Sequence, residues 1–161
     1  MATTKTLSAA LLALGLAAGL AGAASAAAPH AHNRGHGAPA MELRLNNGQK
    51  WQTDEVLRAG MSQIRDVMDA SLPPIHSGRY SAADLSALGE WVQERVDIMV
   101  ANCKLPEEAD LQLHVALTQI LDGVNTMKEE GGQELGAAAI VQALNAYGDH
   151  FDHPGWKPLG Y

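Results

Sequence analysis

Two histidines close to the C-terminus are the first candidates for chemistry. His150 and His153 lie three residues apart, with Asp149 and Asp152 beside them. On one helix face this spacing could bind a divalent metal ion, with the carboxylates orienting the imidazole rings. However, Pro154 biases His153 away from helical geometry, and a histidine at a helix C-terminus can simply interact with the helix dipole. A metal-ligand role and a structural role are therefore both open.

Three further histidines lie near the N-terminus, in a segment rich in Ala, Gly and Pro. His30, His32 and His36 could bind copper or zinc weakly, because ordering a flexible segment around a metal ion costs entropy. Pro29 lacks the amide that an amino-terminal copper motif would need if Ala28 were the first residue. The alternative is a solvated tail.

Cys103 is the single cysteine of the chain, so it cannot form an internal disulfide. It follows Met99 by four residues on an apolar helical stripe, which favours a buried cysteine that behaves as a small hydrophobe. A thiolate metal ligand and an intermolecular disulfide are the alternatives. Lys104 could lower the pKa of the thiol if that thiol is exposed.

No motif of a known catalytic class is present. The chain lacks a G-x-S-x-G, a Walker loop, a His-Glu-x-x-His and a haem-attachment Cys-x-x-Cys-His. The sequence therefore predicts a binding or structural protein rather than an enzyme.

Four helical patterns must position these residues. Apolar side chains recur at spacings of three and four, as in Leu57, Met61, Ile64 and Met68. Ser81 and Asp84 form a capping-box pattern at the start of the second helix. The four helices are expected to begin near Thr53, Ser81, Pro106 and Gln133, with stops at Pro73-Pro74, Gly131-Gly132 and Pro154.

Similar helix lengths and short loops favour an all-α fold, an antiparallel up-down four-helix bundle formed by residues 41–161. Residues 41–45 are expected to form an extended lead-in along the bundle, and residues 155–161 to fold back over one end. Cys103, His150 and His153 would share the end where the first helix begins. His76 would lie at the opposite end, about 25–30 Å away, and would not join them.

Residues 1–26 are typical of a cleavable secretory signal. Lys5 precedes an uncharged run of Leu, Ala and Gly, and Ala24-Ser25-Ala26 offers the small side chains that signal peptidase requires. A transmembrane anchor is less compatible, because the run is short and rich in Ala and Gly. We therefore expect a periplasmic or secreted protein with a flexible histidine-containing tail at residues 27–40.

The chain has a formal net charge of −7. An acidic surface repels phosphate backbones and anionic lipids, so nucleic acid partners and membrane insertion after signal cleavage are not expected. A protein of the cell envelope or a second copy of the chain is the expected kind of partner.

Three stretches of the chain resemble a group of small exported proteobacterial proteins, sometimes labelled DnrO-like. They are residues 48–54 (GQKWQTD), 102–105 (NCKL) and 153–156 (HPGW). The resemblance covers most of the mature chain and implies a periplasmic compartment, but it transfers no activity. Two hypotheses follow from the sequence: a metal-binding or metal-buffering protein, and a structural or protein-interaction module without a bound cofactor.

Overall fold

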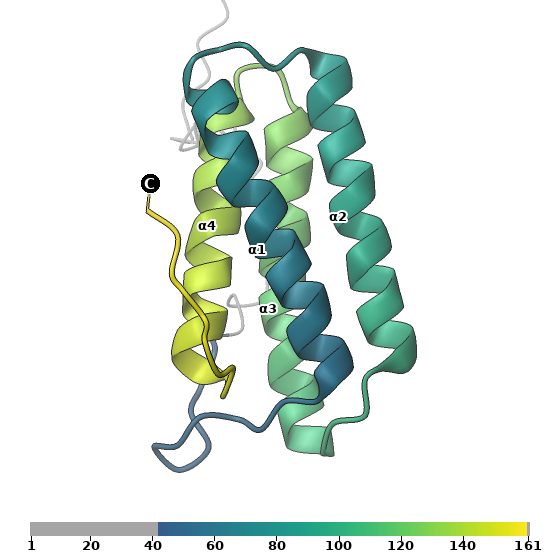
Figure 1. The fold of residues 1–161 in the computed structure, drawn as a ribbon, viewed down its shortest axis with the longest axis vertical. Helices are drawn as coiled ribbons and strands as arrows, with labels where there is room; N and C mark the ends of the chain where they lie inside the picture. The colour runs from purple at the N-terminus through teal and green to yellow at the C-terminus, as the bar shows by residue number, and fades with distance from the viewer. Residues whose placement is uncertain (1–41, 161) are drawn as a thin grey trace, which may run out of the picture. The chain divides into compact units, whose positions relative to one another are not determined.

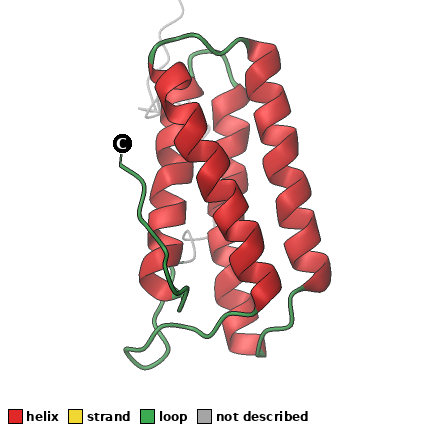
Figure 2. Cartoon of the chain, viewed as in Figure 1, coloured by secondary structure: helices red, strands yellow, loops and turns green. Residues whose placement is uncertain are grey.

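Residues 42–160 are the part of the chain that the computed structural model describes, and they belong to one unit, residues 37–161. Within them the chain forms four helices joined by loops (Figures 1 and 2). These are α1 (Glu55–His76), α2 (Ala82–Asn102), α3 (Glu107–Lys128) and α4 (Gln133–His150). Each contacts the next, and α1 also contacts α4. The all-α prediction is confirmed, and the alternating helix directions in Figure 1 agree with an up-down bundle.

Side-chain caps define where two of the helices begin. Asp54 is the N-cap of α1, and its carboxylate accepts hydrogen bonds from the backbone N–H of Leu57 at 2.7 Å and of Lys104 at 2.6 Å. Ser81 and Asp84 form the predicted capping box at the start of α2. Asp54 therefore also ties the start of α1 to the loop between α2 and α3.

The prediction that Pro73-Pro74 would end the first helix is wrong, because α1 continues to His76. The two prolines lie in its last turns, where only two helical hydrogen bonds are lost. Their carbonyl oxygens accept from the backbone N–H groups of Ser77 and Arg79. Leu72 and Ile75 are buried on either side of the prolines, so core packing holds this turn in helical form.

The core is a single apolar cluster that draws on all four helices. Ile120 of α3 and Leu144 of α4 are both fully buried, as their mid-stripe positions predicted. The helices α3 and α4 lie in the closest contact, because Gly123 and Gly136 face each other there. A Cβ added at Gly136 would overlap backbone atoms of Gly123 and Met127.

The segment before α1 runs against the lower end of the bundle, where α1 begins. Leu43 is buried, and the backbone N–H of Arg44 donates to Gln112 of α3 at 2.7 Å. Trp51 forms a short parallel bridge with Phe151, directly after α4. Residues 42–45 have no helix or strand of their own and lie against the lower end of the bundle; Met41 lies outside the described residues.

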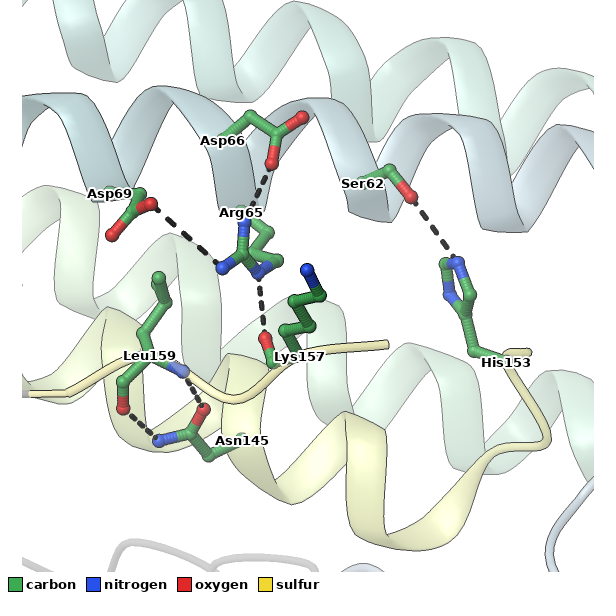
Figure 3. A network of polar contacts seen from close by, with 8 residues as sticks. All are labelled: Ser62, Arg65, Asp66, Asp69, Asn145, His153, Lys157 and Leu159. Atoms are coloured by element: carbon green, nitrogen blue, oxygen red, sulfur yellow. Dashed lines mark hydrogen bonds and ion pairs between the residues drawn. The ribbon is translucent and has the colours of Figure 1, made fainter. Parts of the chain in front are cut away.

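Residues 152–160, which we call the C-terminal strap, do not cover one end of the bundle as expected. They run along the side formed by α1 and α4 (Figure 1). Gly155, with a φ of 81°, reverses the chain. Asn145 of α4 then makes two hydrogen bonds with the backbone of Leu159, at 2.8 and 2.9 Å, and Arg65 of α1 donates to the carbonyl of Lys157 at 2.6 Å (Figure 3). These bonds to helix side chains fix the strap along the side.

None of the helices among residues 42–160 is long and apolar enough to cross a membrane.

Candidate functional site

The predicted site residues His150 and His153 both lie at the lower end of the bundle, but their side chains serve different parts of the fold. His150 ends α4 and is half-buried, and its Nδ1 is hydrogen-bonded to the carbonyl of Ala146 at 2.7 Å. His153 lies beyond the helix in the strap, consistent with the effect expected of Pro154. The two imidazoles therefore do not share a helix face.

Both ring nitrogens of His153 already have protein partners. Its Nδ1 is 3.0 Å from the hydroxyl of Tyr147 on α4, and its Nε2 is 3.2 Å from the hydroxyl of Ser62 on α1 (Figure 3 shows the latter). Tyr147 is fully buried, so its O–H requires an acceptor, and Nδ1 of a neutral imidazole provides one. His153 thus links the strap to two helices.

An aromatic cluster surrounds this imidazole. The ring of Tyr147 stacks on Phe151 with centroids 4.9 Å apart, and it meets Trp156 edge-on at 5.0 Å. Trp156 lies over Gly148, where any side chain would overlap the indole. Burial raises the pKa of Tyr147. The pKa of His153 is lowered, first by burial and then by the positive charge of Arg58.

Acid is therefore expected to weaken the fold through His153. Its pKa lies lower in the folded than in the unfolded protein, so the unfolded state takes up the proton first. Stability should be lost as the pH falls below about 6.5, and the loss should stop growing below the folded pKa. Urea unfolding between pH 4.5 and 8 measures this, and His153→Gln should remove that part of the pH dependence.

His150→Gln serves as the control for this experiment, because it removes the neighbouring imidazole and leaves His153 in place. We expect it to keep the part of the pH dependence that His153 causes. An unchanged pH dependence in His153→Gln would contradict the structural role of this imidazole.

Cys103 caps the end of α2 and is half-buried against the core, so it is only partly the buried hydrophobe that the stripe predicted. The pKa of its thiol is raised by burial and by the carboxylates of Asp110 and Asp54. Lys104 is not among the causes of this shift, and the exposed thiol on which its effect depended is half-buried here. A raised pKa keeps the group a thiol, which is a poor metal ligand and nucleophile.

Within residues 42–160, no group of three or more His, Cys, Asp and Glu side chains is placed to hold a metal ion. His76 lies at the opposite end of the bundle, as predicted, and pairs there with Glu134 at 3.1 Å. His30, His32 and His36 lie outside the described residues.

Sequence reasoning missed Ser62, whose hydroxyl contacts His153. A serine beside a histidine is also the first part of a nucleophile–base pair. Ser62 lies in the interior of α1, however, where backbone N–H groups are committed to the helix and are not free to stabilise an oxyanion. The contact is thus a link between the strap and α1.

A second feature, which sequence reasoning also missed, is a groove between α1 and α2. We call it the α1–α2 groove, and its volume is about 330 Å³. Its floor is formed where α2 crosses Gly60, which has no side chain and leaves room for Met99. The groove is lined by Glu55, Val56, Ala59, Gly60, Gln63, Arg95, Ile98 and Met99.

An exposed apolar side chain borders this groove at the surface, since Ile98 of the lining is 42% exposed. Arg95 is the only cation of the lining, and it is held by partners in its own helix: Glu94 at 2.9 Å and the ring of Trp91, 5.3 Å from the guanidinium carbon. The groove therefore offers a mostly apolar contact surface with a fixed charged edge.

Comparisons with protein-family models, with curated proteins and with solved structures give no match to this chain.

Proposed function

We propose that this chain is an exported, periplasmic docking protein whose α1–α2 groove receives a helix of a partner protein of the cell envelope. The observation that carries the proposal is the α1–α2 groove itself, with Ile98 exposed at its edge. Docking an amphipathic helix in an apolar groove between two helices is a common mode of peptide recognition.

The shape and the packing of this surface support a docking role. Val56, Gly60 and Met99 give the groove an apolar floor, in which the side chain of Met99 packs directly on Gly60. Exposed Ile98 would lose contact with water when a partner covers it, which favours association by about 25 cal/mol per Å² of apolar surface. The polar residues Glu55, Gln63 and Arg95 border the floor, as in the rim of many interfaces.

Export is the part of the proposal that rests on the sequence alone. The uncharged run after Lys5 and the small residues Ala24-Ser25-Ala26 support it. These residues lie outside the described part of the chain.

Weak copper or zinc capture stays a prediction, and it now depends on His30, His32 and His36. At the lower end of the bundle, a metal ion on His153 would compete with the bonds of both its ring nitrogens to Tyr147 and Ser62. The bond of His150 Nδ1 to the carbonyl of Ala146 leaves Nε2 of His150 for a ligand, but His150 belongs to no group of three or more metal-ligand side chains among residues 42–160. We therefore place docking ahead of metal capture.

Site-specific photocrosslinking in cells of the source organism tests the docking function. A photoreactive residue at Ile98 should give one discrete adduct, whose partner mass spectrometry then identifies. The matched control carries the same probe at Leu135, which is 68% exposed on α4 and does not line the groove. Equal adducts from both positions, or none from Ile98, would count against a docking site in the groove.

A further inference from the structure

We propose that the surface beneath the C-terminal strap recognises extended peptide segments, and that the strap is its resident occupant, which a segment of a partner protein displaces. We call this surface the strap seat; it comprises Arg65 of α1 with Asn145 and Gly148 of α4. The displacing segment carries an aromatic and an aliphatic side chain three residues apart. The strap seat is a second site, because none of its residues lines the α1–α2 groove.

The strap seat holds the backbone of the strap. Asn145 accepts from the backbone N–H of Leu159 at 2.8 Å and donates to the carbonyl of the same residue at 2.9 Å (Figure 3). Arg65 donates to the carbonyl of Lys157 at 2.6 Å. Every residue other than proline offers both an N–H and a C=O group. These contacts therefore suit extended segments of many sequences.

Two side chains anchor the strap in the seat. Leu159 is 6% exposed and belongs to the core cluster. Trp156 lies on Gly148, where the absence of a side chain leaves space for the indole. Lys157 and Pro158 between them are exposed. The seat thus selects one aromatic and one aliphatic side chain at a spacing of three and sets little restriction on the residues between.

The strap fills this seat imperfectly. Nε1 of Trp156 is buried and has no hydrogen-bond partner among residues 42–160, and a buried donor without an acceptor is costly. A hollow of about 480 Å³ also remains beside the strap, with Asn145 and Gly148 on one side and Trp156 and Pro158 on the other. A segment with Phe in place of Trp leaves no orphaned N–H, and a larger side chain in place of Pro158 finds room in the hollow.

Few contacts oppose displacement. The strap turns at Gly155, and after this residue only Asn145 and Arg65 make hydrogen bonds to it within the part of the chain that the structure describes. Short terminal segments open locally at far lower cost than the whole fold. The strap is tethered, however, with an effective concentration in the range of about 1 mM. A partner segment must therefore fit better than the strap does.

A peptide added in trans tests the proposal on the full chain. The probe is a fluorescein-labelled peptide with the strap sequence of residues 153–160 (HPGWKPLG), and fluorescence anisotropy measures its binding. The recipient is Trp156→Ala/Leu159→Ala, in which the resident strap lacks both anchors. We expect it to bind the peptide about tenfold more tightly than the wild type, where the intact strap competes. The peptide with Trp156→Phe should bind at least as tightly, and the peptide with Trp156→Ala/Leu159→Ala should not bind.

Two further measurements locate the peptide. Asn145→Ala in the recipient should weaken binding about tenfold, because it removes both bonds to one residue of the peptide backbone. Asn125→Ala, at an exposed position of α3, is the matched control. In the wild type, the NMR signal of the Trp156 indole N–H, assigned with Trp156→Phe, should move to the position of a solvent-exposed indole when excess Phe peptide is added.

Three results would overturn the proposal. The first is no peptide binding by a recipient that circular dichroism shows to be folded; Leu159→Ala alone is the recipient if the double variant does not fold. The second is peptide binding that Asn145→Ala leaves unchanged. The third is a dimer in sedimentation that Asn145→Ala dissociates, since the strap of a second copy would then be the displacing segment. None of these results depends on the Ile98 adduct, which tests the α1–α2 groove separately.

Discussion

Replacing Gly136 with Ala is expected to lower the free energy of unfolding by about 3 kcal/mol, the upper end of the usual cost of overpacking. A Cβ at this position would overlap backbone atoms of Gly123 and Met127, and backbone cannot move aside as a flexible side chain does. The helices α3 and α4 would have to separate, and their shared core contacts would loosen.

The sign of this effect makes the measurement decisive. In a helix interior with free space, Gly→Ala stabilises by roughly 0.5–1 kcal/mol. Urea unfolding followed by circular dichroism measures the change, and Gly160→Ala is the control, because a Cβ there meets open space. A gain in stability for Gly136→Ala would mean that α3 and α4 are not in close contact.

Ile120→Ala and Leu144→Ala should each lower the free energy of unfolding by about 2–5 kcal/mol. Both side chains are fully buried, on α3 and α4 respectively, so truncation removes apolar contacts and leaves a cavity. Chemical denaturation of each single variant measures the loss. A loss below about 0.5 kcal/mol at both positions would contradict the core assignment.

The helices could be predicted because their signals are local. The spacing of Leu57, Met61, Ile64 and Met68 marks one buried face, and all four side chains are fully buried in the structure. The Ser81 and Asp84 pair likewise places the start of α2 correctly. Such patterns depend only on residues within a few turns of each other.

The errors in the fold have a common cause, which is that long-range contacts override a local signal. Pro73 and Pro74 are helix breakers by themselves, yet buried Leu72 and Ile75 hold the last turns of α1 against the core. The path of the strap is set by Asn145 and Arg65, which are 14 and 92 residues from their partners in the strap. No local sequence pattern predicts these long-range hydrogen bonds.

The site was predicted less well than the fold. The sequence placed Cys103, His150 and His153 at one end of the bundle, as the structure has them. Their positions in the sequence did not predict which residues each side chain contacts. The bond of His153 to Ser62 joins residues 91 positions apart. The α1–α2 groove also depends on how Gly60 of one helix meets Met99 of another, which only the packed structure shows.

The most direct test of a docking function is to fill the groove while the crosslinking probe stays at Ile98. Ala59 is exposed and lines the groove, so Ala59→Arg should block a partner without harming the fold. Its matched control is Ala70→Arg, also exposed on α1. We predict that the Ile98 adduct disappears with Ala59→Arg and persists with Ala70→Arg. An adduct of unchanged yield in Ala59→Arg, with unfolding stability equal to that of the wild type, would contradict the account.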